Sequence, residues 1–309
     1  MSWFDSAVVA MMPLMPRPLM RRLSRPYIAG VRLEDAIELV RQLERERMMA
    51  TLDLLGEHIT RLDAADRARD AYLGLLGEIH RTGVAANISI KLTQLGLTVD
   101  RDACRESLDT LVRRARELGC FVRIDMEDSS CTDATLELYR GLRRDGLDNV
   151  GVVLQAMLRR TLEDARALAR EGANVRLCKG IYVEPPTIAY RDRDEVRRSY
   201  LASLEALWDG GCYVALATHD DELIARARER IAARGLERAA YEFQMLLGVR
   251  PALRRSLVDS GERLRVYVPF GENWYAYSLR RMRENPQVAG HVARSIVGGL
   301  LGRTNGSNS

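Results

Sequence analysis

Residues 121–170 read FVRIDMEDSSCTDATLELYRGLRRDGLDNVGVVLQAMLRRTLEDARALAR, and the alternation inside this stretch decides the fold. Short apolar or β-branched runs begin near Phe121 and Val150. Each run is followed by a turn and then by a charged segment in which Leu and Ala recur at helical spacing, over Thr132–Arg144 and Thr161–Arg170. The stretch therefore predicts two consecutive units, each made of one strand and one helix.

The same rhythm continues in both directions, from about residue 50 onward. Candidate strands begin near Ala50, Ala86, Phe121, Val150, Asn174, Cys212, Ala239 and Arg263. Their spacings of 24 to 38 residues leave room for one helix after each strand. Eight such units predict an α/β fold of the closed (β/α)₈ type, the TIM barrel. A doubly wound sheet is the alternative, and it is weakened because no GxGxxG sequence follows any predicted strand.

Further helices are expected between the remaining strands, at Asp102–Leu118, Asp194–Trp208 and Asp221–Ala233. Several of the expected helices open with Thr or Asp, which suit an N-cap. The first 45 residues, especially Leu33–Met48, have a helical pattern and lie outside the repeat. We therefore expect an N-terminal helical extension packed on the barrel over residues 1–48, the barrel itself over residues 49–301, and a flexible tail over residues 302–309.

Composition excludes several classes of protein. The chain has 309 residues, of which 47% are apolar and 29% are charged, so it is neither disordered nor fibrous. Its 47 Lys and Arg are balanced by 43 Asp and Glu; because phosphate binding needs clustered cations, no nucleic-acid partner is expected. The five cysteines are never closer than 11 positions, which argues against a disulfide framework and against a zinc or other metal site.

The N-terminal segment bears on the compartment. Ala7–Met15 is apolar but too short to span a bilayer, and Asp5 rather than a cation precedes it, which argues against a signal peptide. We therefore expect a cytoplasmic protein. The segment is also rich in Met and is followed by four arginines, a combination that suits peripheral contact with the inner, anionic face of a membrane. Packing of the segment on its own domain is favoured over that contact.

Polar and ionisable residues end almost every predicted strand. They are Glu57 and His58, Lys91, Asp125 and Glu127, Gln155, Arg176 and Lys179, Thr218 and His219, and Gln244. In a (β/α)₈ barrel the carboxyl ends of the strands meet at one face, where the active sites of such barrels lie. Any single residue could simply mark where a strand emerges into water. Together they predict a ring of charged and amide groups that bind one another or a polar ligand, because such groups are costly to bury without partners.

The segment VYVPFGENWYAYSLRRMREN, residues 266–285, is read as the eighth strand, a turn and a helix. On this helix Tyr277, Arg280, Arg281 and Glu284 share one face, at positions i, i+3, i+4 and i+7. Two adjacent guanidiniums can hold a carboxylate through paired hydrogen bonds, and a tyrosine can supply a flat wall for an apolar ring. A solvated Arg/Glu face is the ordinary alternative, but such faces seldom need the neighbouring tyrosines, Tyr267 among them.

These residues resemble the proline dehydrogenase family, whose closing pattern is Y-x-P-x-G followed by Y-x-x-R-R-x-x-E-N. The pattern is matched by Tyr267, Pro269, Gly271, Tyr277, Arg280, Arg281, Glu284 and Asn285. The family's R-L-x-K-G-x-Y signature at the fifth strand is matched by Arg176, Leu177, Lys179, Gly180 and Tyr182. Further matches are Ser89–Leu92, Arg123–Glu127, Ala217–His219 and Glu242–Leu246. The chain departs from the family at Cys178, where an aliphatic residue is typical, and at Leu247, where an aromatic residue or histidine is common.

The resemblance implies a distorted (β/α)₈ barrel with extra N-terminal helices, which holds FAD noncovalently at the carboxyl ends of the strands. It implies oxidation of L-proline to Δ1-pyrroline-5-carboxylate by hydride transfer from proline C5 to flavin N5, the first step of proline catabolism toward glutamate. A membrane quinone is the expected electron acceptor. Functional coupling to a pyrroline-5-carboxylate dehydrogenase is a further expectation.

The resemblance also assigns roles within the site. The expected catalytic residues are Lys91, Asp125 and Arg176. The expected substrate-binding residues are Lys91, Leu246, Tyr267, Tyr277, Arg280 and Arg281. Asp125 would orient Lys91, whose charge it would neutralise in a partly desolvated cleft. Glu57 would pair with Arg280 as a gate when the site closes.

The residues expected to hold FAD are Gln155, Arg176, Lys179, Gly180, Tyr182, Thr218, His219 and Glu284. Of these, Arg176 would lie close to flavin N5 and Gln155 would form a hydrogen bond to the ring. A histidine at the end of a strand is often only a hydrogen-bonded core residue, and this alternative stays open for His219.

Two other classes of protein remain open. A Schiff-base lyase of the TIM-barrel type would use Lys91 or Lys179 as its nucleophile, because barrel-end lysines with lowered pKa values do such work. A noncatalytic binding or scaffolding protein would need an exposed apolar patch rather than convergent charge. Neither explains the helix face that carries Tyr277 and the two arginines.

Overall fold

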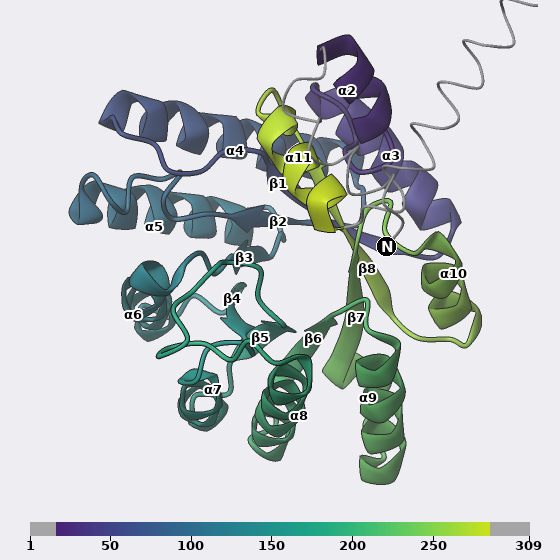
Figure 1. Ribbon diagram of the computed structural model, residues 1–309. Coiled ribbons are helices and arrows are strands. Elements are labelled where there is room, and N and C mark those ends of the chain that lie inside the picture. Colours follow the sequence, from purple (N-terminus) through teal and green to yellow (C-terminus); the bar gives the residue numbers. More distant parts are fainter. Residues whose placement is uncertain (1–16, 285–309) are drawn as a thin grey trace, which may run out of the picture.

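The computed structural model describes residues 17–284, apart from the side chains of residues 17, 19, 23 and 280–284, and Figure 1 shows its arrangement. The strands are β1 Met49–Leu54, β2 Ala86–Ile90, β3 Val122–Ile124, β4 Val150–Gln155, β5 Asn174–Cys178, β6 Tyr213–Ala217, β7 Tyr241–Leu246 and β8 Leu264–Phe270. The helices between them are α4 Leu62–Thr82, α5 Arg101–Glu117, α6 Thr132–Arg144, α7 Thr161–Arg170, α8 Arg193–Asp209, α9 Asp221–Arg234 and α10 Pro251–Asp259. The remaining helices are α2 Arg17–Ser24 and α3 Leu33–Arg45 before β1, and α11 Trp274–Glu284 after β8.

The strands pair in sequence order, all in parallel, and β8 returns to pair with β1, which closes the barrel. In this register Asp53 of β1 lies opposite Ser89 of β2 on one side and opposite Pro269 of β8 on the other. The predicted (β/α)₈ barrel is confirmed, and the doubly wound open sheet is wrong. Every strand begins within two residues of its predicted start, because a buried parallel strand is marked by a continuous apolar run.

The interior of the barrel contains buried cations as well as apolar side chains. Arg123 of β3 is buried there, and it donates hydrogen bonds to the carbonyl oxygens of Val152 at 3.0 Å and of Asn174 at 2.8 Å. Gly151 makes room for it, since a Cβ at this position would collide with the Arg123 guanidinium and lie 2.6 Å from the Asn174 carbonyl oxygen. The mainly apolar barrel interior therefore contains an arginine, and its hydrogen-bond partners lie on β4 and β5.

Three of the outer helices begin at an aspartate cap. The side chains of Asp100, Asp192 and Asp220 accept hydrogen bonds from backbone N–H groups in the first turns of α5, α8 and α9. The expectation of threonine caps is wrong for two helices: Thr132 and Thr161 are the first residues inside α6 and α7, and neither helix has a side-chain cap.

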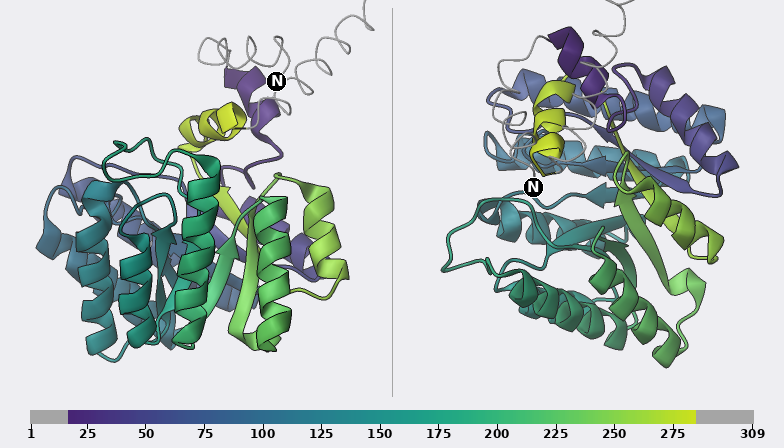
Figure 2. Two further views of the ribbon diagram at one scale, coloured as in Figure 1. Left: turned by 60° about the horizontal axis from the view of Figure 1, so that its bottom comes forward. Right: turned by 45° about the vertical axis from the view of Figure 1, so that its right-hand side comes forward.

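Two helices occupy positions that follow from the closure of the barrel. α3 lies outside the barrel against β1 and β8, the place that a helix following the eighth strand would take, and it ends at Arg45 rather than at the predicted Met48. α11 instead crosses the carboxyl ends of the strands and lies beside α2 (Figure 2). The sequence predicts a helix after β8 but not its position over the mouth of the barrel.

A second, smaller hydrophobic cluster fastens α2 and α11 to the barrel mouth. Its buried members are Met20, Tyr27, Ile28, Leu55, Val249 and Tyr277. The chain between α2 and α3 passes close to the β7–α10 turn, where Gly248 has φ +76° and a Cβ would lie 2.7 Å from the carbonyl carbon of Pro26. The N-terminal segment is therefore in direct contact with the loops that surround the mouth.

Within residues 17–284 no helix is long and apolar enough to cross a membrane. The Met-rich segment Ala7–Met15 and the tail predicted over residues 302–309 lie outside the described residues.

Candidate active site

A cavity of about 1010 Å³ opens at the carboxyl ends of the strands. The residues at predicted strand ends or in the predicted site that line it are Glu57, Lys91, Asp125, Gln155, Arg176, Lys179, Gly180, Tyr182, Thr218, His219, Gln244, Leu246, Tyr267 and Tyr277. Two other strand-end residues, His58 and Glu127, are not among its lining residues. The barrel thus gathers into one space residues that lie far apart in the sequence.

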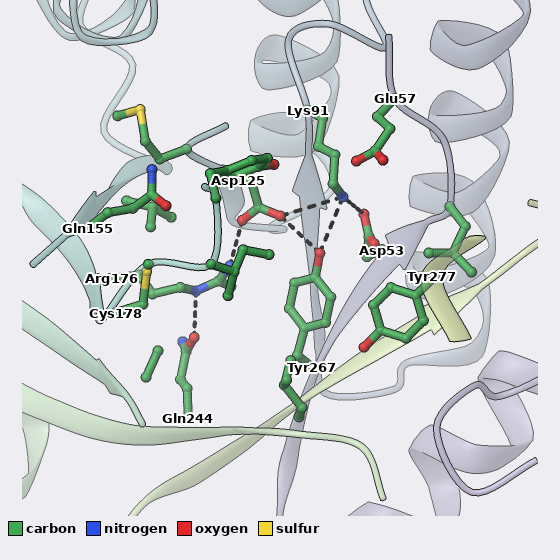
Figure 3. Close-up of a pocket in the computed structure, with 18 of the residues that line it drawn as sticks. Asp53, Glu57, Lys91, Asp125, Gln155, Arg176, Cys178, Gln244, Tyr267 and Tyr277 are labelled. Atoms are coloured by element: carbon green, nitrogen blue, oxygen red, sulfur yellow. Dashed lines mark hydrogen bonds and ion pairs between the residues drawn. The ribbon is translucent and has the colours of Figure 1, made fainter. Parts of the chain in front are cut away.

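Lys91, directly after β2, stands at the centre of the charged part of this cavity (Figure 3). Its Nζ donates a hydrogen bond to Asp53 Oδ1 at 2.8 Å and lies 3.8 Å from Asp125 Oδ2. The hydroxyl of Tyr267 is 3.4 Å from the same nitrogen. The expectation that Asp125 is the residue that orients Lys91 is therefore incomplete, because the closer carboxylate is Asp53.

Asp125 is instead the acceptor for three other groups. Its Oδ1 accepts hydrogen bonds from Arg176 Nη1 at 2.6 Å and from Ser89 Oγ at 2.7 Å, and its Oδ2 accepts one from Tyr267 Oη at 2.9 Å. The guanidinium carbon of Arg176 also lies 5.4 Å from the centre of the Tyr267 ring. Asp125 thus ties together β2, β3, β5 and β8 at the floor of the cavity.

The charges of this centre shift one another's titration. Burial by itself would lower the pKa of Lys91, but the carboxylates of Asp53 and Asp125 outweigh burial and raise it. Burial raises the pKa of Asp53, against the lowering effect of Lys91, and the charge of Asp125 adds to the rise. Burial and then Asp125 raise the pKa of the Tyr267 hydroxyl well above its usual value. Lys91 is therefore held as an ammonium ion and Tyr267 as a neutral hydroxyl.

Arg176 is supported from below by a chain of buried polar groups. Its Nε donates to Gln244 Oε1 at 2.6 Å, and Gln244 Nε2 in turn donates to Glu242 Oε1 at 2.6 Å. Arg265 Nε donates to the same oxygen of Glu242 at 2.8 Å. The remaining Arg176 nitrogen, Nη2, is buried and has no hydrogen-bond partner among the described residues. The two N–H donors on Nη2 are thus left without an acceptor in the described part of the chain.

Gln155 and Cys178 line the same wall. Gln155 is buried, and its Nε2 donates to the backbone oxygen of Glu127 at 2.8 Å, so its amide orientation is fixed by the protein itself. Cys178 occupies the neighbouring position on β5, opposite Gln155 in the sheet register. Burial raises the pKa of the Cys178 thiol to about 11, so this thiol is neutral at physiological pH.

A cluster of cations surrounds Asp220 at the β6 end of the cavity. Lys179 Nζ, Arg193 Nη2 and Arg197 Nη2 lie 3.2, 3.4 and 3.0 Å from its carboxylate oxygens. Burial favours the neutral acid, but Arg197 and Lys179 together lower the pKa of Asp220 well below its usual range. Arg197 also pairs with Asp194 at 3.0 Å and with Glu222 at 2.7 Å, so carboxylates balance the cations of this cluster, of which Lys179 lines the cavity.

Glycine and histidine have specific places next to this cluster. Gly180 has φ +103°, and a Cβ there would lie 2.5 Å from Cγ and Sδ of Met157, so no other residue fits without a shift. His219 Nε2 accepts a hydrogen bond from the backbone N–H of Leu246 at 2.9 Å. Nε2 therefore accepts and carries no proton. The hydrogen bond fixes the end of β7, where Leu246 is the last residue.

The loop that carries Glu57 is anchored beneath the cavity. The backbone N–H of His58, a residue with φ +51°, donates to Thr93 Oγ1 at 2.9 Å. Thr93 in turn donates to Glu127, from its backbone N–H to Oε1 at 2.9 Å and from its hydroxyl to Oε2. His58 and Glu127 are therefore supports of the loop rather than parts of the cavity wall.

Tyr277 reaches the cavity from α11 and at the same time belongs to the small cluster that joins α11 to α2. The side chains of Arg280, Arg281 and Glu284, which follow it on the same predicted face, lie outside the described residues. The clamp predicted from this face, and the pairing of Glu57 with Arg280, stay predictions.

Several lining residues were not predicted from the sequence, and two of them, Asp53 and Asn273, are polar groups with hydrogen bonds that the structure shows. Asp53 interrupts the apolar run MATLDL of β1, and this interruption is the signal that could have identified it. Asn273, in the turn before α11, donates to the backbone oxygen of Leu55 at 3.1 Å, and nothing in its sequence context distinguishes it from an ordinary turn residue.

Comparison with known proteins gives a consistent result. The model of the family described as proline dehydrogenase matches residues 36–294. The chain is 37% identical over 287 residues to proline dehydrogenase of Deinococcus radiodurans, covering 92% of this chain and 93% of that protein. It is 33% identical over 274 residues to proline dehydrogenase 1 of Bacillus subtilis, covering 89% of this chain and 90% of that protein.

A solved structure resembles the barrel. Proline utilization A from Bdellovibrio bacteriovorus, inactivated by N-propargylglycine, matches with a TM-score of 0.81 and 25% sequence identity over 86% of this chain. The match covers 33% of that larger chain, so this chain spans about a third of its length.

Proposed function

The chain belongs to the proline dehydrogenase family of oxidoreductases, and from this premise we propose that it oxidises L-proline to Δ1-pyrroline-5-carboxylate with noncovalently bound FAD. The observation that carries the proposal is the arrangement of Lys91, Asp125, Arg176 and Tyr267 around one cavity of about 1010 Å³. A cation for a carboxylate and an aromatic wall for a ring are both present there.

The chain's residues fit a flavin on three counts. Arg176, whose buried Nη2 has no partner among the described residues, lines a cavity large enough for a cofactor. Gly180 leaves the backbone bare at the wall, where a side chain would collide with Met157. Lys179, which lines the cavity and whose side chain is 38% exposed, suits a phosphate group. When bound, FAD supplies at its N5 atom the acceptor for the hydride that leaves proline C5.

We assign the cofactor contacts accordingly. Arg176 and Gln155 would hold the ring end, since both side chains have fixed orientations. The remainder of the cofactor would be lined by Lys179, Gly180, Tyr182, Thr218, His219 and Glu284. If so, Lys179→Ala and Thr218→Ala should each lose FAD on dilution more readily than the parent protein, as fluorescence of released flavin would show. Full retention in both would contradict the assignment.

The proposed substrate contacts follow from charge. Lys91, fixed as an ammonium ion, would bind the proline carboxylate with Arg280 and Arg281. Tyr267, Tyr277 and Leu246 would pack on the ring carbons. Glu57 would pair with Arg280 to close the site.

With Arg280 and Arg281 beside Lys91, the substrate end of the site would also disfavour a second positive charge on the substrate. It would help proline to lose its amine proton, which must leave before the hydride can depart. Asp125 would hold Arg176 and Tyr267 in place during this step.

The finer physiology is part of the proposal. We propose a membrane quinone as electron acceptor, a cytoplasmic location with peripheral contact at the inner face of the membrane, and functional coupling to a pyrroline-5-carboxylate dehydrogenase. The alternative, a Schiff-base lyase, is disfavoured for Lys91, because such a nucleophile needs a lowered pKa and that of Lys91 is raised.

One measurement tests the main proposal. The purified protein should show flavin absorbance bands, and anaerobic L-proline should bleach them. A protein that lacks these bands, and in which added FAD cannot restore them, would overturn the proposal. A colourless protein that borohydride traps covalently with a carbonyl substrate would support the lyase instead.

A further inference from the structure

Asp53 is the buried carboxylate closest to Lys91, and Lys91 is the cation that it pairs with among the described residues. Its side chain is 1% exposed, and its Oδ1 accepts from Lys91 Nζ at 2.8 Å. Its second oxygen, Oδ2, is buried and unpartnered within the described part of the chain. The charge of Asp53 is thus paired, within the described part of the chain, with the ammonium group of Lys91.

The neighbouring carboxylate is engaged differently. Both oxygens of Asp125 are already acceptors, Oδ1 for Ser89 and Arg176 and Oδ2 for Tyr267. Its distance to Lys91 Nζ, 3.8 Å, is an ion-pair distance rather than a hydrogen bond. The two aspartates therefore divide the cations of the cavity between them, Asp53 with Lys91 and Asp125 with Arg176.

From this division we propose that Asp53 is the positioning residue for Lys91, holding its ammonium group at the place where the substrate carboxylate binds. The proposal rests on the function proposed above. Asp53 acts through Lys91 and needs no contact with the substrate. Its position on β1, opposite Ser89 of β2, brings it within reach of Lys91 only because the two strands pair in parallel in this register.

The charged and titratable groups around Lys91 come from four strands and the residues that directly follow them. Asp53 comes from β1, Asp125 and Glu127 follow β3, Arg176 comes from β5 and Tyr267 from β8. Burial alone lowers the pKa of a lysine, and here the carboxylates oppose it. Removing the charge of Asp53 removes the closest of them. The ammonium group should then lose its proton at a lower pH than in the parent protein.

The test uses the flavin-loaded enzyme and tetrahydro-2-furoate, a ring carboxylate without an amine, so that the ligand does not titrate in the range studied. Its Kd is followed by the perturbation of flavin absorbance from pH 7 to pH 9.5. We compare the ratio of Kd at pH 9.5 to Kd at pH 7 in each enzyme. For Asp53→Asn we expect this ratio to be on the order of 10-fold larger than for the parent enzyme. Glu127→Gln is the matched control, since it also removes a buried carboxylate but one that bonds to Thr93 instead; its Kd should follow the parent profile more closely.

A double-mutant cycle separates positioning from general damage. If Asp53 acts only through Lys91, then Asp53→Asn should change Kd by less than about twofold in a Lys91→Met background. A parent-like pH profile in Asp53→Asn, or a full effect that persists in the Lys91→Met background, would overturn the inference. If L-proline does not bleach the flavin absorbance of the parent enzyme, the proposed function is overturned instead.

A second readout covers the case in which Asp53→Asn does not fold. In Lys91→Met the buried Asp53 has no counter-ion, so its folded-state pKa rises further above its unfolded value. The folded state then holds an extra proton at acidic and neutral pH, and stability should fall as pH rises toward that raised pKa. The melting temperature of Lys91→Met should therefore drop more than that of the parent between pH 5.5 and pH 8.5, and parallel curves would overturn the inference.

Discussion

Replacing Asp125 by alanine should destabilise the fold severely, since this carboxylate accepts hydrogen bonds from Ser89, Arg176 and Tyr267 at 2.7, 2.6 and 2.9 Å. The Arg176 side chain is only 7% exposed, so Asp125→Ala leaves its charge buried without a carboxylate partner. Breaking a buried pair from one side costs about 3–5 kcal/mol. Asp125→Asn keeps an acceptor oxygen and the shape, so its loss should be smaller, about 1.5–3 kcal/mol.

The assay is urea denaturation of the two variants and the parent, followed by circular dichroism, with the slope of the transition checked for constancy. Asp70→Ala is the control, because this aspartate forms an exposed ion pair with Arg69, and its cost should stay within about 0.5 kcal/mol. A loss below about 1 kcal/mol in Asp125→Ala, or equal losses in the alanine and asparagine variants, would refute the reasoning that Asp125 compensates a buried cation.

Three further changes test other contacts. Gly248→Ala should cost about 2–4 kcal/mol in urea denaturation, because its Cβ meets the Pro26 carbonyl at a positive φ, whereas Gly172→Ala, with positive φ but open space, should cost about half of that; equal costs would count against the contact. Cys178, with a pKa of about 11, should react with iodoacetamide at pH 8 roughly 200-fold more slowly than an ordinary thiol and about tenfold faster per pH unit up to pH 10, as peptide mass spectrometry would measure; rapid labelling at pH 8 would contradict the shift. Tyr277→Ser should weaken use of proline but narrow its advantage over 4-hydroxyproline, because a tyrosine wall leaves little room for a hydroxyl; an unchanged ratio of the two kcat/KM values would show that Tyr277 is not a wall of the substrate site.

The sequence predicts the barrel well because its strands are buried on both faces and are punctuated by turns. The residue at which each helix begins is predicted less well from the sequence. Thr132 and Thr161 have the chemistry of caps, yet each lies one residue inside its helix, because the cap position depends on how the preceding loop approaches. The position of α11 over the mouth was not predicted either, since it depends on α3 occupying the outer place between β8 and β1.

Which residues of the site pair with one another is harder to predict than which residues belong to it. Lys91 and Asp125 both stand at strand ends, and the sequence places them correctly in one cavity. Which carboxylate holds the lysine depends on the register between β1 and β2 and on the direction of each side chain, neither of which is encoded locally. Asp53 looks like a single polar interruption of an apolar strand until the barrel closes around it.

Because β8 closes the barrel by pairing with β1, the polar centre cannot be completed until β8 has been synthesised. Asp125 has been synthesised long before its partner Tyr267, which lies 142 residues further along the chain. At translation rates of about 5–20 residues per second, this delay is roughly 7–28 s. During that interval the nascent chain holds Lys91, Asp125 and, later, Arg176, without the strand that seals β1. A circular permutant whose termini lie in another βα gap would assemble the same polar centre in a different temporal order.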